Sequence, residues 1–448
     1  MSRYKAYPAY KDSAVNWLNS IPTHWGLNRF KNIFKIQKKI AGALGYDVLS
    51  ITQRGVKIKD TESGDGQLSM DYSKYQLVRK NDFAMNHMDL LTGYVDISKF
   101  DGVTSPDYRV FSLADENQHP RYFLYLLQLC YIAKIFYPLG QGAAQIGRWR
   151  LPTEAFSEFV APTPAYAEQQ SIAAFLDHET MKIDALIEKQ QRLIELLKEK
   201  RQAVISHAVT QGLNPNAPMK DSGVEWLGEV PAHWSLPKVK WFFCTESGGT
   251  PNTAKHDDYY LDGTIPWIRT TDLNNDELYE TPINITKKAV VDSACALLPV
   301  NSVLVAMYGG AGSIGKHALL KFESAINQAV CAILPNPKIG PEFLHLYVEF
   351  YRPYWMVGAE GTRKDPNINQ DVIRELIVPC PPYDEQRKIV ETIKVGLSKI
   401  DSTIKRCETN IALIQERRTA LISAAVTGKI DVRDWQAVAV QEGVGVES

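Results

Sequence analysis

The chain has 448 residues, of which 45% are hydrophobic and 10% aromatic, so at about 150 residues per domain it is long enough for roughly three packed units. Its 50 Lys and Arg residues nearly balance 51 Asp and Glu residues, and the net charge of −1 neither supports nor excludes a nucleic-acid partner; basic residues that bound one would have to cluster in the folded protein. The sequence excludes some classes of protein: no stretch approaches the about 18 consecutive apolar residues of a membrane span, and Met1–Tyr10 has no apolar run that would indicate a signal peptide. The six cysteines lack Cys-x-x-Cys or zinc-type spacing, so we expect free thiols in a reducing cytoplasm.

A motif near the N-terminus occurs again in the middle of the chain. Residues 11–27 have the pattern KDSxVxWLxxxPxHWxL, and residues 220–236 have the same pattern. At least ten of the seventeen positions are identical, including two tryptophans, and such self-similarity indicates a duplicated architecture. A second pair of matching segments follows later in each half, Pro164–Thr210 and Pro381–Thr427. The chain therefore consists of two halves, each with a variable region followed by a shared segment.

Each later shared segment is predicted to form one long helix. Between residues 168 and 209 the apolar side chains recur with gaps of three, four and seven, and a glycine and a proline follow the pattern. The second helix is expected over residues 384–426, with Gly396 as a weak point. Each would have about 42 residues and a length of roughly 60 Å. A helix that long buries its apolar stripe best against another long helix, so we expect the two to pack antiparallel as a coiled coil.

The regions between the shared segments, 28–160 and 237–378, look unrelated to each other in sequence. Both contain short β-rich runs among turn residues, and a helical run precedes the end of each, at 120–136 and 341–355. The expected fold class is mixed α/β (α+β), with two such domains separated by the two long helices and an internal pseudo-two-fold repeat. The boundaries that follow are 1–165 for the first domain, 166–213 for the first long helix, 214–382 for the linker repeat and second domain, 383–430 for the second long helix, and 431–448 for a C-terminal tail.

Two short motifs are similar to enzyme signatures but lack parts that the chemistry needs. Gly310–His317 matches GxGxxG and nearly matches a phosphate loop, yet His317 replaces the Ser or Thr that would hold magnesium, and too few residues follow for the required helix. Cys380–Tyr383 is similar to the Pro-Pro-Tyr motif of adenine methyltransferases, but a cysteine stands where Asn or Asp would accept the amino hydrogen. We interpret the first as a Gly-rich surface loop and the second as a strand that ends in proline before a helix.

Signatures of other chemistry are missing from the sequence. No convincing set of carboxylates with a lysine indicates a nuclease, and nothing indicates a helicase. His24 and His233 recur in the repeat, each beside a tryptophan and without a second ligand nearby in the sequence, so packing in the core or a turn is a better interpretation than metal binding. We therefore expect no catalytic residue, no cofactor and no metal.

Polar loops and basic clusters give non-specific support for nucleic-acid binding. Basic residues gather between Arg29 and Lys39 and again between Arg54 and Lys59, although runs of this kind also occur on ordinary solvated faces. Arg, Asn and Gln are the side chains that make paired contacts to base edges, whereas Lys mostly neutralises phosphate. On residue type and loop position, the candidate DNA-contacting residues are Gln53, Arg54, Asn86, Arg269, Thr271 and Arg363.

The combination of repeated motifs resembles the specificity subunit of Type I restriction-modification enzymes. The resemblance rests on KDSGVEWLGEVPAHW at 220–234 after a helix that ends in AVTQGL, and on AAVTGKIDVR at 424–433. Within the variable regions, Leu49–Thr52 and Val103–Tyr108 resemble one type of target-recognition domain, and Ser247–Pro251 with Ile265–Ile268 resembles another. The resemblance covers nearly the whole chain.

This resemblance implies that the chain recognises DNA and that other subunits of a complex carry out the chemistry. Two target-recognition domains would each read one half of a bipartite site in double-stranded DNA, and the two long helices would set the length of the unspecified spacer. Two modification subunits would dock on the repeated segments and supply methylation that depends on S-adenosylmethionine, and two restriction subunits would add ATP-driven translocation and cleavage. The chain itself would be a cytoplasmic, non-catalytic subunit without a membrane partner. Two alternatives remain open: a nucleotide-dependent transferase that uses Gly310–Lys316, and a coiled-coil adaptor without DNA contact.

Overall fold

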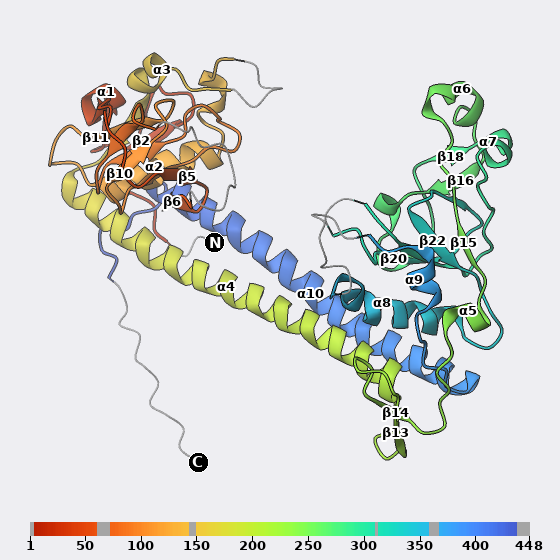
Figure 1. Cartoon of the computed structure of the whole chain (residues 1–448). Coiled ribbons are helices and arrows are strands. Elements are labelled where there is room, and N and C mark those ends of the chain that lie inside the picture. The colour runs from red at the N-terminus through yellow and green to blue at the C-terminus, as the bar shows by residue number, and fades with distance from the viewer. Residues whose placement is uncertain (1–3, 61–71, 143–148, 310–311, 358–366, 437–448) are drawn as a thin grey trace, which may run out of the picture. The chain divides into compact units, whose positions relative to one another are not determined.

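A computed structural model describes residues 4–60, 72–142, 149–309, 312–357 and 367–436. The chain divides into two compact units, with residues 1–190 and 408–448 in unit 1 and residues 191–407 in unit 2. Both units have mixed α/β content, and two long helices, α4 (Tyr166–Gln211) and α10 (Tyr383–Val426), are each shared between them (Figure 1). The predicted fold class and the predicted pair of long helices are confirmed.

The two long helices run antiparallel within each unit. In unit 1 the start of α4 packs against the end of α10, and Asp184 of α4 accepts a hydrogen bond of 3.0 Å from Arg418 of α10. In unit 2 the end of α4 packs against the start of α10, and Arg201 lies 3.3 Å from Asp401. Asp184 and Asp401 occupy equivalent positions of the repeat, as do Arg201 and Arg418. The same interhelical ion pair therefore occurs once in each unit.

Unit 1 contains the first variable region. Its other elements are β1 (Tyr10–Asp12), β2 (Ser20–Pro22), β3 (Gly26–Arg29), α1 (Phe30–Ile33), β4 (Phe34–Gln37), β5 (Leu49–Thr52), β6 (Gly55–Ile58), β7 (Gln76–Val78), β8 (Phe83–Met85), β9 (Val95–Ile97), β10 (Gly102–Thr104), β11 (Arg109–Leu113), α2 (Pro120–Ile132), η1 (Tyr137–Leu139), α3 (Thr153–Glu158) and β12 (Val160–Thr163).

The core of unit 1 forms around a four-stranded antiparallel sheet in the order β4-β11-β8-β9. Phenylalanines from the sheet, from α2 and from α3 pack on one another there, with Phe83 and Phe111 stacked at 5.2 Å between ring centroids. Helix α2 is buried along most of its length, and the same core continues into Phe175 of α4 and Ile422 of α10. Burial of this much aromatic surface fixes the first variable region on its helix pair.

Unit 2 contains the second variable region. Its other elements are β13 (Met219–Asp221), β14 (Glu229–Pro231), α5 (Val239–Phe242), β15 (Thr245–Ser247), η3 (Thr253–Lys255), α6 (His256–Tyr259), β16 (Ile265–Ile268), η4 (Thr270–Asp272), β17 (Glu277–Leu278), β18 (Asn284–Ile285), α7 (Lys287–Asp292), β19 (Val303–Ala306), β20 (His317–Leu320), β21 (Ala325–Ile326), β22 (Val330–Ile333), α8 (Pro341–Val357) and α9 (Gln370–Arg374).

The sheet of unit 2 has five strands in the order β15-β22-β19-β20-β17, and a smaller sheet has the order β18-β16-β21. Strands β19 and β20 are antiparallel neighbours, so the Gly-rich segment between them joins two strands of a hairpin. A phosphate loop instead leads from a strand into a helix, and α8 begins only at Pro341. The topology therefore contradicts a nucleotide site at Gly310–Lys316; residues 310 and 311 themselves lie outside the described residues.

The repeated motif forms the same small structure in both units. Strands β1 and β2 pair antiparallel with Tyr10 opposite Pro22, and β13 and β14 pair with Met219 opposite Pro231. The aspartate of each hairpin accepts a hydrogen bond of 2.9 Å from the backbone two residues on, Asp12 from Ala14 and Asp221 from Gly223. Much of the sequence identity in this motif is thus explained by the turn that it has to form.

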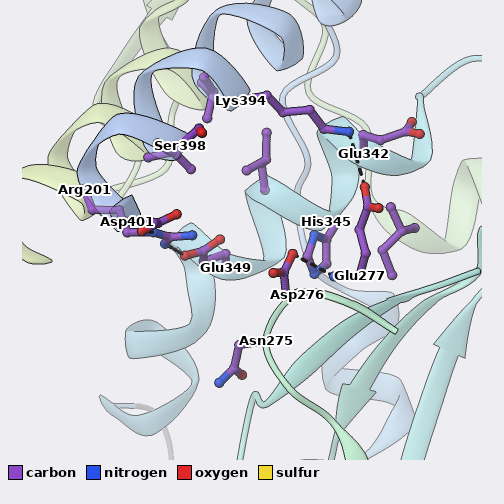
Figure 2. Close-up of a pocket in the computed structure, with 14 residues that line it drawn as sticks. Arg201, Asn275, Asp276, Glu277, Glu342, His345, Glu349, Lys394, Ser398 and Asp401 are labelled. Carbon is purple, nitrogen blue, oxygen red and sulfur yellow. Dashed lines mark hydrogen bonds and ion pairs between the residues drawn. The ribbon is translucent and has the colours of Figure 1, made fainter. Parts of the chain in front are cut away.

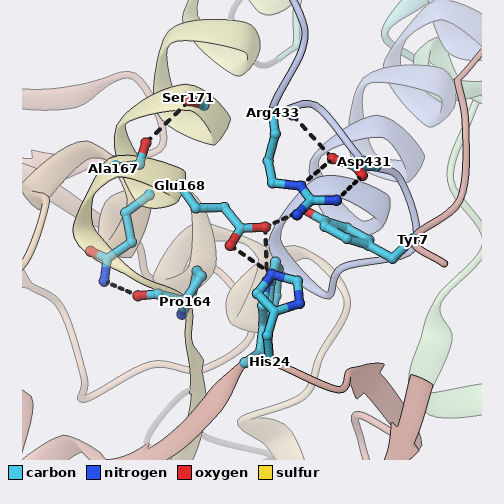
Figure 3. Close-up of polar contacts among 10 residues, drawn as sticks. Tyr7, His24, Pro164, Ala167, Glu168, Ser171, Asp431 and Arg433 are labelled. Atoms are coloured by element: carbon cyan, nitrogen blue, oxygen red, sulfur yellow. Dashed lines mark hydrogen bonds and ion pairs between the residues drawn. The ribbon is translucent and has the colours of Figure 1, made fainter. Parts of the chain in front are cut away.

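A glutamate at the start of each long helix holds the histidine and tryptophan of this motif. Figure 3 shows Glu168 beside His24 in unit 1. In unit 1, Glu168 lies 3.0 Å from His24 Nε2 and accepts hydrogen bonds from Trp25 Nε1 at 3.0 Å and from the Tyr7 hydroxyl at 2.7 Å. In unit 2, Glu385 lies 2.8 Å from His233 Nε2 and accepts a hydrogen bond of 3.2 Å from Trp234 Nε1.

The two histidines are 43% and 48% exposed and lie in the turns that follow β2 and β14. Of the two interpretations, core or turn, the turn is the one that the structure has, whereas both tryptophans are buried. The glutamate ties the linker motif to the first turn of its helix, and this arrangement explains why Glu, His and Trp recur together.

The N-terminal and C-terminal segments meet in unit 1. The amide of Asp431 donates a hydrogen bond of 2.8 Å to the carbonyl of Lys5, and the Arg433 guanidinium pairs with Asp431 and lies over the Tyr7 ring, as Figure 3 shows. Burial, with Glu168 as a further cause, raises the pKa of Tyr7, so this phenol remains a hydrogen-bond donor at neutral pH. Among the described residues, no helix is long and apolar enough to cross a bilayer.

Candidate nucleic-acid interface

Four polar loops of unit 2 converge at one edge of its five-stranded sheet. Strands β15, β22 and β19 are neighbours, so the loop after Ser247, the loop before Val330 and the loop after Ala306 lie side by side. Gln328 connects them: its carbonyl accepts a hydrogen bond of 3.1 Å from the Tyr308 hydroxyl, and its amide oxygen accepts one from Thr250. We call residues 247–250, 269–272, 308–309 and 327–328 the unit 2 loop edge.

The backbone packs closely at this edge, and the packing explains the Gly-Gly pair of the Ser247–Pro251 motif. A Cβ atom on Gly248 would lie 1.7 Å from the carbonyl oxygen of Ile326, so only glycine fits there. The amide of Gly249 donates a hydrogen bond of 3.1 Å to the same carbonyl. The loops are thus fixed by main-chain contacts, and the exposed side chains they carry are presented from a rigid base.

Two of the candidate DNA-contacting residues lie at this edge. The amide of Asn327 donates to the carbonyl of Ile268 at 2.9 Å, which places Arg269 and Thr271 next to the 327–328 loop. Thr271 is exposed, and its hydroxyl contacts Asp272. The Arg269 guanidinium makes two hydrogen bonds of 3.2 Å to Asp272. This contact leaves the other N–H donors of the guanidinium unused, so Asp272 orients Arg269 without preventing it from binding a base.

Two of the three candidates of unit 1 lie at the tip of the β5–β6 hairpin. Thr52 pairs with Gly55, so Gln53 and Arg54 form a two-residue turn, and both are exposed. The Thr52 hydroxyl accepts a hydrogen bond of 3.1 Å from the Arg54 amide and so stabilises the turn. Gln53 reaches the carbonyl of Thr92 at 3.4 Å, whereas the Arg54 guanidinium has no hydrogen bond or ion pair with any other described residue. Arg54 is therefore an exposed cation with free donors.

Asn86 lies at the base of the loop that Gln53 contacts. Its amide donates to the carbonyl of Tyr94 at 2.9 Å, and its side-chain oxygen accepts a hydrogen bond of 3.3 Å from Met88. The half-buried side chain therefore stabilises a turn, although its NH₂ group is not used in these contacts. The neighbouring His87 is also half-buried, and burial lowers its pKa to about 3. The loop over 86–94 links Gln53 and Asn86 into one surface region of unit 1.

Two residues of the first basic cluster form a contact that recurs in unit 2. Arg29 and Lys31 pair with Glu158 at 3.0 and 2.7 Å. Lys238 at 2.7 Å and Lys240 pair with Glu375 in unit 2. Arg29 and Lys31 are thus the repeat equivalents of the two lysines, so these two residues of the cluster form a contact of the duplicated scaffold.

The structure therefore groups the candidates into two surface regions, one in each unit. Gln53, Arg54 and Asn86 belong to unit 1, Arg269 and Thr271 belong to unit 2, and Arg363 lies outside the described residues. Sequence reasoning missed Tyr308, Thr250 and Ser247 as members of the unit 2 loop edge. Their proximity depends on strand order, although the Ser247–Pro251 motif had marked part of it. Within the described parts of the chain, no group of three or more His, Cys, Asp or Glu residues could hold a metal ion.

Comparison with known proteins places this architecture in a family of DNA specificity proteins. The family model described as the Type I restriction modification DNA specificity domain matches twice, at residues 33–197 and 232–413. The chain belongs to this family. Its two matches correspond to the two halves of the internal repeat, each with one variable region and one long helix.

Individual relatives carry the same description. The chain is 25% identical over 296 residues to the EcoBI specificity subunit of Escherichia coli, an alignment that covers 64% of this chain and 61% of that one. It is 22% identical over 445 residues to the MjaX specificity subunit of Methanocaldococcus jannaschii, covering 93% and 96%. The chain thus spans about three fifths of the first relative and nearly all of the second.

The fold itself has a solved counterpart. A chain from a structure on complex assembly and conformational transition of the type I R-M system superimposes with a TM-score of 0.68 at 12% identity, over 92% of this chain and 99% of that chain. The resemblance inferred from the repeated motifs is confirmed, and with it the class of a specificity subunit without catalytic activity of its own.

Proposed function

We propose that this chain reads a bipartite site in double-stranded DNA, one half-site with each variable region, on behalf of the catalytic subunits of a Type I restriction-modification complex. The observation that carries the proposal is the duplication: matched scaffold contacts in both units support unmatched polar loops. Different loops on equivalent supports are what two different half-sites require. The unit 2 loop edge and the Gln53–Arg54 turn are the surfaces proposed to enter the major groove, where amide, hydroxyl and guanidinium groups can discriminate all four base pairs.

Two modification subunits are the proposed partners of the repeated segments. Identical residues that remain exposed in both copies are not explained by packing within the chain, and two alike partners would explain them. Tyr166 and Tyr383 are equivalent and are 40% and 51% exposed, and Leu196 and Leu413 are equivalent and are 45% and 57% exposed. Each unit carries one residue of each pair. Two restriction subunits would complete a cleaving complex, and its place would be the cytoplasm, in keeping with six unpaired cysteines.

Methylation-site mapping tests this function directly. Cells expressing the chain with its modification partner should acquire methylated adenines at one bipartite sequence, and cells expressing the partner alone should not. Arg54→Ala should lower discrimination at one base of the unit 1 half-site by about 1–3 kcal/mol if the guanidinium reads a guanine, or weaken binding to all sequences about equally if it contacts phosphate. Absence of any chain-dependent methylation would refute the proposal.

A further inference from the structure

A polar cavity separates part of the second variable region from the long helices in unit 2. It has a volume of about 210 Å³ and is lined on one side by β17 and α8 and on the other by α4 and α10 (Figure 2). Elsewhere the two sides pack through apolar side chains, such as Phe343 of α8 and Ile389 of α10. Apolar packing supplies adhesion but is non-directional. At the cavity, the contacts between domain and helices are made by charged side chains.

Two ionic bridges span this cavity. Glu349 of α8 accepts a hydrogen bond from Arg201 of α4, which also lies 3.3 Å from Asp401 of α10. Glu277 at the start of β17 accepts a hydrogen bond of 3.2 Å from Lys394 of α10. The Glu349 side chain is only 13% exposed, and burial raises its pKa although Arg201 acts against that shift. A poorly solvated carboxylate has a strong preference for a fixed cationic partner.

The equivalent position in unit 1 carries a bridge of opposite polarity. Asp177 of α4 is the repeat equivalent of Lys394, and it pairs with Arg121 of α2 and accepts a hydrogen bond of 2.7 Å from Tyr125. In both units this helix position thus connects to its own variable region, but the signs of the two charges are exchanged. The helices are therefore not interchangeable supports, since each one matches the charge of its own domain.

We propose that Arg201–Glu349 and Lys394–Glu277 are positioning contacts that fix the orientation of the second variable region on the long helices, and through it the spacer length at which both half-sites are read. The inference rests on the proposed function. One additional base pair moves a half-site by about 3.4 Å and turns it by about 35°. A domain held only by apolar contacts could follow such a change more easily than one held at two charged points. The four side chains need not touch DNA, so the bases read by unit 2 stay the same.

The test uses the full chain with its modification partner and a DNA library in which both half-sites are constant and the spacer varies by one base pair in each direction. Glu277→Gln combined with Glu349→Gln keeps the shape of both side chains and removes both charges. The expected result is a rise of about tenfold in methylation at the altered spacers relative to the native spacer, without any change in the half-site sequences. The matched control Asp184→Asn removes an exposed charge of the interhelical pair in unit 1 and should leave the spacer preference within about twofold.

Two substitutions of Lys394 separate positioning from simple loss of structure. Lys394→Glu places a negative charge opposite Glu277 and should relax the spacer preference, whereas Lys394→Arg keeps the positive charge and should retain the preference of the original chain. Two results would overturn the inference while leaving the proposed function intact. One is an unchanged spacer profile in the double Gln variant, and the other is a change in half-site sequence without a change in spacer preference. Failure of the original chain to direct methylation would instead refute the proposed function.

Discussion

Replacing the helix-start glutamate by alanine should destabilise unit 1 more than unit 2. In unit 1, Glu168→Ala removes the acceptor of two buried donors, since Trp25 is 0% exposed and Tyr7 is 4% exposed. A buried donor without an acceptor costs about 1–3 kcal/mol, so the expected loss is about 2–6 kcal/mol. In unit 2, Glu385→Ala leaves one buried donor, Trp234 at 1% exposure, and the expected loss is about 1–3 kcal/mol.

Solvent access increases this difference. The Glu385 side chain is 28% exposed and that of Glu168 is 6% exposed, so water can enter the space left in unit 2 more easily than in unit 1. The half-exposed histidines can turn to solvent in both variants and contribute little. The histidine, the tryptophan and the helix start are otherwise alike, which makes the two substitutions a matched pair within one chain.

Hydrogen exchange measured by mass spectrometry on the full chain resolves the two sites separately. Peptides around 22–28 should exchange faster in Glu168→Ala, peptides around 231–237 should exchange faster in Glu385→Ala, and urea unfolding followed by tryptophan fluorescence should give the larger loss for Glu168→Ala. An equal or larger loss for Glu385→Ala would show that burial of the donors does not control the energetics of this contact.

Three further outcomes follow from the structure. Burial lowers the pKa of His345 to about 4 and also lowers the pKa of its hydrogen-bond partner His317. The unfolded chain therefore binds protons that the folded chain does not, and the folded state loses stability as the pH falls from about 6.5 towards 4. Between pH 7 and pH 5, urea unfolding of unit 2 should show a loss of about 2 kcal/mol from His345, and a stability that does not change with pH would contradict this prediction. Gly396→Ala has open space for its Cβ in mid-helix and should raise the thermal unfolding temperature, with a gain of up to about 1 kcal/mol. Gly428→Ala should lower the thermal unfolding temperature, because this residue has φ +73° and its Cβ would lie 2.4 Å from Pro22. If Gly396→Ala and Gly428→Ala had the same unfolding temperature, the strain predicted at the end of α10 would be refuted.

The sequence was sufficient for everything that depends on local periodicity and on internal comparison. The spacing of apolar residues predicted helices over 168–209 and 384–426, and the structure has them at 166–211 and 383–426. The repeated motif predicted a duplicated architecture, which the matched pairs at Glu168 and Glu385 support in atomic detail. The repeat also marked His24 and His233, but their partners lie 144 and 152 residues away, too far for any spacing rule to connect.

The contacts between distant segments were decided only by the tertiary structure. The sequence places Arg29 and Lys31 in a basic cluster but does not show that Glu158 pairs with both. In the same way it predicts Arg269 as a base-contacting residue but does not show that Asp272 orients its guanidinium. The Gly-rich segment after β19 matched a phosphate loop by pattern, yet the antiparallel pairing of β19 with β20 makes it part of a hairpin. A sequence determines helices and repeats because those depend on neighbours a few residues apart, whereas strand order and ion-pair partners depend on which distant segments can be buried together.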